Sequence, residues 1–195
     1  MNCSQTAFLF LLVLTSVAVR GADKAPNPEE HPMKTDEHIL VVYYSRTGNT
    51  ERVAKDLVAR LHADVERIDD KADRDGFAGY LSALYDSLRK VAADIAKPQK
   101  DPANYTLTVV GTPVWAWNMT PAARAYLEAT KGRPRAIAFF VTSGDTDAGK
   151  IVPGMEIVAG QKAIAFTGFN ATELKDPAVY EKKLATFVSA LQSRP

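Results

Sequence analysis

The sequence is poor in cysteine, in histidine and in net charge, and each shortage excludes a class of function. Cys3 is the single cysteine, so an intramolecular disulfide framework and a cysteine-rich zinc site are excluded. The three histidines, His31, His38 and His62, are too few to predict a multi-histidine metal site. Lysine and arginine (24 residues) balance aspartate and glutamate (23), and the formal net charge of +1 lacks the basic excess that binds nucleic acid.

Long hydrophobic runs are lacking as well. The run from Ala7 to Val19 has 13 residues and is polar only at Thr15 and Ser16. Because about 18 to 20 apolar residues are needed to cross a bilayer, we expect no stable membrane span here. The run has the length of a signal-peptide core, and small side chains flank Arg20 where a signal peptidase would cleave. Residues 1–21 are therefore predicted to be a signal peptide, which makes the mature protein periplasmic or secreted.

Two features of the N-terminal segment bear on this prediction. No lysine or arginine precedes Ala7, although signal peptides usually begin with a positive segment. Translation from Met33, just before the first predicted strand, would instead give a cytoplasmic protein, and this alternative stays open. Residues 22–37 carry three prolines among charged residues and have almost nothing to bury, so they are predicted to be a disordered tether. The folded domain is then 38–195.

Within this domain, two hydrophobic periods alternate along the chain. Continuous β-branched and aromatic runs predict buried strands, an alternating run at 63–68 predicts an edge strand, and apolar stripes at helical spacing predict helices. Pro153 and Gly154 fall inside one stripe, so that helix is expected to be short or irregular. The predicted strands are 38–44, 63–68, 105–111, 135–142 and 161–167, and the predicted helices are 50–62, 76–95, 120–132, 147–160 and 176–191.

Five strands separated by helices predict an α/β fold, a doubly wound five-stranded parallel sheet with helices on both faces. Such sheets bind ligands at the carboxyl ends of their strands, near the point where the strand order reverses. The loops after Tyr44, Gly111 and Thr142 are therefore the candidate binding loops.

The first of these loops is rich in groups that bind phosphate. Hydroxyl groups and a glycine stand where a helix exposes its unpaired N–H groups and the positive end of its dipole. The alternative is an ordinary N-cap, but a cap needs one such residue and this loop has several. The loop lacks the glycine pattern of dinucleotide-binding folds, which argues against a pyrophosphate. The candidate phosphate ligands are Ser45, Arg46, Thr47, Gly48, Asn49 and Thr50.

The second loop carries both tryptophans of the chain. They either pack into the core or offer an indole on which a flat heterocycle can stack. A ligand with a phosphate at one end and a ring at the other has the shape of flavin mononucleotide (FMN). The candidate ring-binding residues are Thr112, Pro113, Val114, Trp115, Ala116, Trp117 and Asn118.

Three segments resemble the flavin-binding loops of the flavodoxins. ILVVYYSRTGNTERVAKDL resembles their first strand, phosphate loop and first helix, VVGTPVWAWNMTPAARAYLE their second loop, and FFVTSGDTD falls where the third loop belongs. The resemblance spans Ile39 to Leu191. It implies non-covalent FMN, with residues 45–50 on the phosphate and 112–118 along the ring, where Trp115 or Trp117 stacks. It also implies that the third loop offers N–H groups to the ring from Thr142, Ser143, Gly144 and Asp145.

Three departures from electron-carrying flavodoxins favour an enzyme. Residues 143–146 supply no aromatic side chain to cover the second ring face, residues 115–118 lack the glycine that permits a peptide flip, and the chain is nearly neutral rather than acidic. We expect a reductase that passes electrons from NAD(P)H to a quinone or a similar small acceptor, with no catalytic side chain assigned. The alternatives are an electron carrier that docks to redox partner proteins and a flavin-free binding domain. An exported protein would need another donor, because reduced nicotinamides are scarce outside the cytoplasm.

Overall fold

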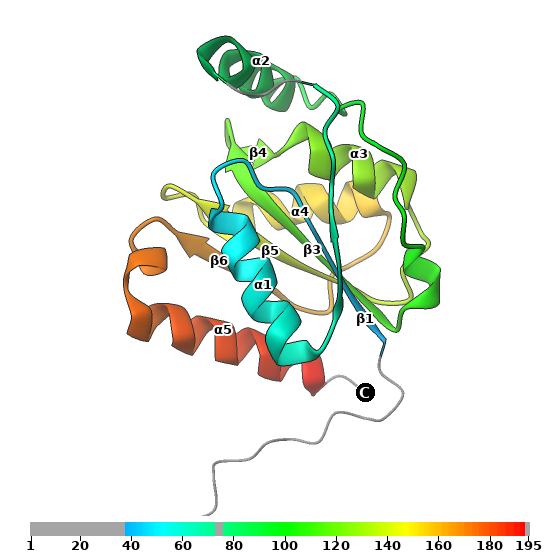
Figure 1. The fold of residues 1–195 in the computed structure, drawn as a ribbon, viewed down its shortest axis with the longest axis vertical. Helices are drawn as coiled ribbons and strands as arrows, with labels where there is room; N and C mark the ends of the chain where they lie inside the picture. The colour runs from blue at the N-terminus through cyan, green and yellow to red at the C-terminus, as the bar shows by residue number, and fades with distance from the viewer. Residues whose placement is uncertain (1–37, 73–75, 194–195) are drawn as a thin grey trace, which may run out of the picture. The chain divides into compact units, whose positions relative to one another are not determined.

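The computed structural model describes residues 38–72 and 76–193, so the predicted signal peptide (1–21) and tether (22–37) lie outside the described residues. Five parallel strands form the sheet in the order β2-β1-β3-β5-β6, and Figure 1 labels all of these except β2. Their bounds are β1 Ile39–Tyr43, β2 Asp64–Arg67, β3 Leu107–Trp115, β5 Ile137–Ser143 and β6 Phe166–Asn170. In the described part of the chain, no helix is long and apolar enough to span a bilayer, and no cluster of three or more metal-ligating side chains occurs.

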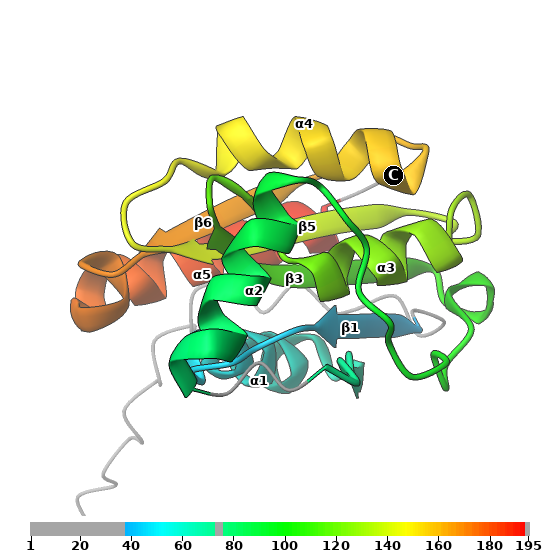
Figure 2. The same ribbon diagram turned by 90° about the horizontal axis from the view of Figure 1, so that it is seen from above.

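Two helices cover each face of the sheet (Figure 2). The core on one face packs β1 and β5 against α1 (Asn49–Leu61) and α5 (Pro177–Gln192). The core on the other face packs the same strands against α3 (Pro121–Ala129) and α4 (Ala148–Ala159). Short 3-10 turns, η1 (Pro102–Asn104) and η2 (Glu173–Lys175), lie in the connections. The predicted doubly wound α/β fold is confirmed.

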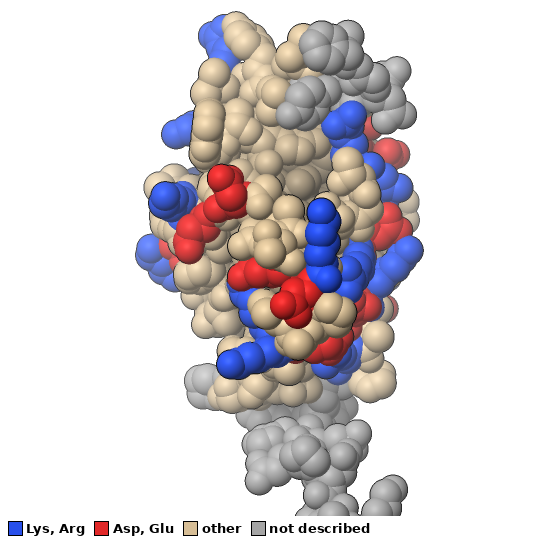
Figure 3. All heavy atoms as spheres, turned by 90° about the vertical axis from the view of Figure 1, so that its left-hand side faces the viewer, with Lys and Arg blue, Asp and Glu red and all other residues tan. Residues whose placement is uncertain are grey.

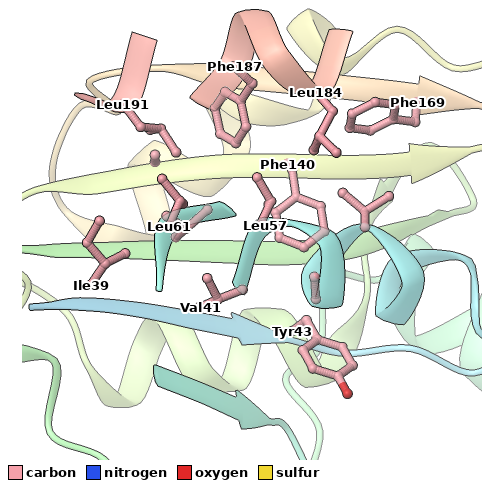
Figure 4. Packing of buried hydrophobic residues seen from close by; sticks show 14 of the residues in the cluster. Ile39, Val41, Tyr43, Leu57, Leu61, Phe140, Phe169, Leu184, Phe187 and Leu191 are labelled. Atoms are coloured by element: carbon pink, nitrogen blue, oxygen red, sulfur yellow. The ribbon is translucent and has the colours of Figure 1, made fainter. Parts of the chain in front are cut away.

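The strand β1 is apolar along its whole length because both of its faces are buried. All five of its residues are buried, and successive side chains point to opposite faces of the sheet. Ile39, Val41 and Tyr43 belong to the core on the side of α1 and α5, and Figure 4 shows Leu57 and Leu61 near β1 and Leu184 and Phe187 nearer Phe140. Leu40 and Val42 face α3 and α4. A strand with one polar face could not have occupied this position.

The second helix is shorter than its apolar stripe suggested. The stripe predicted a helix over 76–95, but α2 spans Gly76–Leu88 and is followed by a turn at Lys90, whose φ is +57°. Beyond the turn, Ala93 N–H donates to the Pro121 carbonyl and Ile95 pairs with Asp70 in an antiparallel bridge. Val91 N–H still donates to the Asp86 carbonyl in the turn that ends α2, whereas Ile95 fits the helical period by coincidence, because the backbone around it is bonded to other elements.

The region after β5 differs from the prediction in two ways. The α4 helix is continuous over twelve residues although it contains Pro153, which lies on its exposed side. The last strand was predicted at 161–167 as a buried strand, whereas β6 begins at Phe166, lies at the edge of the sheet and leaves Phe166 half exposed. Glu156 of α4 explains the shift, because its carboxylate accepts from Lys162 Nζ and Ala163 N–H and holds that segment at the helix.

The third strand is longer than predicted and turns back on itself. It was predicted to end at Gly111, but β3 continues to Trp115 and pairs with a short antiparallel strand, β4 (Asn118–Met119). This hairpin adds a sixth strand to the five parallel ones. Figures 1 and 2 show α2 above the hairpin, at the end toward which the parallel strands run. The candidate ring-binding loop is therefore a defined hairpin rather than an irregular loop.

Candidate functional site

The three candidate loops begin side by side at the carboxyl edge of the sheet. Tyr43 of β1 lies opposite Gly111 of β3, which lies opposite Phe140 of β5. A Cβ atom on Gly111 would stand 2.0 Å from Phe140 Cζ, so only glycine allows the ring to cross β3 there. The strand order reverses between β1 and β3, which is where sheets of this kind bind their ligands.

The loop between β1 and α1 leaves backbone N–H groups without partners. Gly48 occupies the N-cap position of α1 with a φ of +90°. Because glycine has no side chain, no side-chain hydrogen bond caps this helix. The N–H of Gly48 donates to Ser45 Oγ at 3.2 Å. In the described residues, the N–H groups of Thr47, Asn49, Thr50 and Glu51 donate to no protein atom. The amino end of α1 is therefore open to an anion.

Three other helices, α3, α4 and α5, are capped at their amino ends in the ordinary way. Thr120 accepts a hydrogen bond from Ala123 N–H at the start of α3, and Asp147 accepts one from Gly149 N–H at the start of α4. Asp176 caps α5 by accepting from Ala178 and Val179 N–H. Since α1 lacks such a bond, its polar loop is not an ordinary N-cap.

The side chains of this loop divide into buried and exposed groups. Ser45 and Thr50 are buried, whereas Arg46, Thr47 and Asn49 are exposed. Thr50 Oγ1 lies 2.7 Å from Thr142 Oγ1, which joins the first loop to the end of β5. The loop is also held from β2, because Arg67 Nη2 donates to the Ser45 carbonyl at 3.1 Å, a contact that the sequence analysis did not anticipate.

Charges of both signs surround the amino end of α1. Glu51 stands in the first turn, where its carboxylate would repel a bound anion. Lys55 Nζ lies 2.7 Å from that carboxylate, and its hydrogen bond keeps the pKa of Glu51 below the usual value. Burial, followed by the charge of Glu51, raises the pKa of Tyr43 above its usual value. The loop therefore attracts an anion through N–H groups and hydroxyls, and its nearest carboxylate is already paired.

The hairpin of β3 and β4 separates the two tryptophans. Ala116 and Trp117 form its tip with φ values of +45° and +57°, the sign that a type I′ turn requires at both positions. Asn118 Nδ2 donates to the Ala116 carbonyl at 3.1 Å and supports this turn. Trp115 is partly buried with its ring edge-on to Tyr44 at a centroid distance of 5.6 Å, whereas Trp117 is 76% exposed. Trp115 packs inside the protein, and Trp117 is the free indole.

The base of the hairpin is fixed by a buried hydroxyl pair. Thr112 Oγ1 donates to the Pro113 carbonyl, accepts from Thr120 N–H at 3.2 Å and lies 3.0 Å from Thr120 Oγ1. Both threonines are fully buried. Thr112 was expected to line the ring, but its side chain is engaged in holding the hairpin against the start of α3. Val114 and Ala116 are partly buried and line a cavity between the hairpin, the third loop and α2.

The third loop is held at both ends and open in the middle. Ser143 Oγ donates to the Thr146 carbonyl at 2.8 Å, and the Gly144 carbonyl accepts from Ala171 N–H at 3.2 Å. Among the residues that the structure describes, the N–H groups of Gly144 and Asp145 donate to no protein atom. Both residues are exposed, so these donors are available to a ligand.

A cavity of about 460 Å³ lies between the hairpin, the third loop and α2. The hairpin contributes Val114, Ala116 and Trp117, and the third loop contributes Gly144, Asp145 and Thr146. The third wall was missed by the sequence analysis, which named no residue of α2 as a candidate site residue. That wall consists of Leu84, Tyr85 and Leu88.

The model of one protein family, the flavodoxins, matches residues 38–161. The chain belongs to the flavodoxin family. Solved structures of the same fold include a flavoprotein from Lactobacillus acidophilus in complex with FMN (20% identity, TM-score 0.60, covering 75% of this chain and 98% of the other). Another is a putative flavoprotein from Bacteroides eggerthii (21% identity, TM-score 0.58, 78% and 98%). At these identities the likeness shows the fold alone, and no curated protein matches the sequence.

Flavodoxins bind FMN, so the cofactor predicted from the sequence is confirmed as that of the family. The residues at the carboxyl edge of the sheet fit FMN. The amino end of α1 supplies unpartnered N–H groups, and no atom lies within 4 Å of the place where a Cβ of Gly48 would stand. The cavity beside Trp117 is within the size range of small-molecule sites. The bond between Thr50 and Thr142 keeps the two ends of the site in contact.

Proposed function

We propose that this flavodoxin binds FMN non-covalently along its carboxyl edge and acts as an NAD(P)H-linked reductase of a quinone or a similar small, flat acceptor. The observation that carries the proposal is the cavity of about 460 Å³ walled by Trp117, the third loop and α2, next to a helix whose amino end is uncapped. An electron carrier needs only an exposed ring edge. A cavity with an apolar third wall is suited to a second small molecule beside the ring.

The phosphate would be held by the first loop. The free N–H groups of Thr47, Asn49, Thr50 and Glu51 supply donors, and the hydroxyls of Thr47 and Thr50 add two more. Ser45 is buried and accepts from Gly48 N–H, so its role is to shape the loop. Arg46 is exposed beside these groups and would add positive charge.

The ring would lie against the hairpin tip and the third loop. Trp117 offers the exposed indole, while Trp115 is engaged with Tyr44. The N–H groups of Gly144 and Asp145 have no protein acceptor and would donate to the ring, which favours negative charge on it. When bound, FMN would take electrons from a reduced nicotinamide and pass them to the acceptor. The chain itself would position the two molecules against each other.

The surface around the site supports a small-molecule acceptor over a protein with a strongly charged docking face. Figure 3 shows this side of the molecule, where uncharged atoms dominate the upper part around a hollow. Lysine and arginine alternate with aspartate and glutamate below it, and neither sign forms a continuous field. Electrostatic steering of a charged protein partner needs such a field.

Purified protein reconstituted with FMN provides the test. Under anaerobic conditions, NADPH should bleach the flavin absorbance rapidly, and a benzoquinone should restore it with many turnovers. A potentiometric titration should give a slope of about 30 mV per tenfold change in the ratio of oxidised to reduced flavin, the value for two electrons. Flavin that NADPH leaves oxidised, together with a slope of about 59 mV, would contradict the reductase.

The second candidate is an electron carrier, and one observation favours it. Leu81, Tyr85 and Leu88 of α2 are all about half exposed near the cavity, and such apolar side chains are common in protein interfaces. A carrier would exchange electrons with a reduced redox protein faster than with NADPH. Sequencing the N-terminus of the native protein would show whether residues 1–21 are removed, and an exported form would require this kind of donor.

A further inference from the structure

The contact between Thr50 and Thr142 joins two segments that are 92 residues apart. Thr50 is the second residue of α1, and Thr142 is the penultimate residue of β5. Their Oγ1 atoms are 2.7 Å apart, and the residues are only 1% and 3% exposed. Water therefore does not compete with this bond. In residues 38–72 and 76–193, neither hydroxyl makes another hydrogen bond.

A count of hydrogens shows that this pair is incomplete. Each hydroxyl has one hydrogen to donate and can accept through its oxygen. One of the two hydrogens lies in the bond between Thr50 and Thr142, so the other has no acceptor. A buried donor without an acceptor is unfavourable, and a ligand that supplies the acceptor removes this cost. The direction of the shared bond decides which residue keeps the spare hydrogen.

We propose that Thr142 is a positioning residue for the phosphate end of the site. By donating to Thr50 Oγ1, Thr142 leaves the Thr50 hydrogen for a phosphate dianion at the uncapped amino end of α1. This direction is selected because a hydrogen bond to an anion is stronger than one between neutral groups, and because each bond in such a chain polarises the next. The inference rests on the proposed function, since the anion is the phosphate of FMN.

The role differs from the one that the family resemblance assigned. The resemblance implied that Thr142 donates its backbone N–H to the ring at the other end of the site. The side chain of Thr142 instead points to Thr50. A residue on β5 thus orients a donor on α1, and the strand that carries the third loop also sets the strength of the phosphate site.

The test compares FMN with riboflavin, which has the same ring and no phosphate. Thr142→Val keeps the shape of the side chain and removes the hydroxyl, so FMN should bind about tenfold more weakly and riboflavin should change less than twofold. Thr142→Ser should restore FMN binding. The double variant Thr50→Val, Thr142→Val should bind FMN no more weakly than Thr50→Val alone, because the two hydroxyls act as one unit. Quenching of flavin fluorescence gives each dissociation constant.

Thr108→Val is the matched control. Thr108 lies in the same sheet, is fully buried, and its hydroxyl has no hydrogen-bond partner, so its removal should leave the FMN-to-riboflavin ratio unchanged. An unchanged ratio in Thr142→Val, whether both ligands weaken equally or neither does, would overturn the inference. A wild-type protein that binds FMN no better than riboflavin would instead contradict the phosphate site of the proposed function.

Discussion

The two ends of the site are built in opposite ways. The phosphate end comes from one stretch of six residues, Ser45 to Thr50, anchored by two buried hydroxyls and by the start of α1. The ring end is assembled from three segments far apart in the sequence, namely α2, the hairpin tip and the third loop. Its main side chains, such as Trp117 and Leu88, are exposed. The first is a rigid local motif, and the second is an open surface made by the tertiary structure.

This difference assigns the two ends different tasks. In the proposed site, a local cradle of N–H groups would supply affinity and recognise a charge that every FMN molecule carries. An exposed, apolar cavity supplies little affinity for the phosphate but decides what can reach the ring. Substitutions at the phosphate end should therefore separate FMN from riboflavin, and substitutions at the ring end should affect both flavins or only the acceptor.

The largest effect is expected from Gly48→Val. Its Cβ would occupy the open cradle, and a β-branched residue at a φ of +90° is strained, so FMN should bind about 3 kcal/mol more weakly while riboflavin binds almost as before. Gly132→Val is the control, because Gly132 has a φ of +70° and equally open space after α3. Both variants should lose about 2 kcal/mol of unfolding free energy, but only Gly48→Val should lose FMN. Equal FMN binding in the two variants would contradict a phosphate site at Gly48.

The next effect concerns the two tryptophans. Trp117→Ala should weaken FMN and riboflavin alike by about 1–3 kcal/mol, the range for stacking on an aromatic side chain. Its apo form should keep its melting temperature, because Trp117 is exposed. Trp115→Ala should instead lower the unfolding free energy by about 2 kcal/mol through the lost packing on Tyr44. If Trp115→Ala weakened flavin binding and Trp117→Ala left it unchanged, the stacking residue would be Trp115 instead.

A smaller effect is expected along α2. Leu88→Ala removes an apolar wall of the cavity and should raise the KM for a quinone about fivefold, with FMN affinity unchanged within twofold. Leu81→Ala makes the same change on the same helix at a half-exposed residue that does not line the cavity. Steady-state kinetics of the two variants should differ. If both raise the KM equally, the cavity wall has no special part in binding the acceptor.

The smallest effect concerns charge at the phosphate end. Glu51→Gln removes a carboxylate from the first turn of α1, so FMN should bind about two- to threefold more tightly at low salt, and riboflavin should not respond. Since the bond from Lys55 lowers the pKa of Glu51, the carboxylate stays ionised near neutrality, and the gain should be equal at pH 7.5 and pH 8.5, where the phosphate of FMN is also a dianion. Glu128→Gln, an exposed change in the last turn of α3, should show no gain. A gain that persists in 0.5 M salt would rule out this electrostatic cause.

The sequence was sufficient for the elements whose signals are local. The buried run of β1, the starts of α3 and α5, and the polar loop before α1 were all found, because hydrophobic period and cap chemistry act over a few residues. The predicted end of α2 was wrong, because the apolar residues keep their helical spacing past Leu88 while the backbone beyond it bonds to other segments. The predicted position of β6 was wrong, because Glu156 in the preceding helix binds residues at the start of the predicted strand.

By itself, the sequence determined the alternation of strands and helices, the family, and the polar loop before α1, since each of these depends on neighbours along the chain. Only the tertiary structure decided that Trp117 is exposed while Trp115 is packed, that α2 walls a cavity, and that Thr142 meets Thr50. An apolar or hydroxyl side chain gives the same local signal whether it fills a core or faces a ligand. The distinction depends on which distant segment lies across from it, and that is set by how the elements pack.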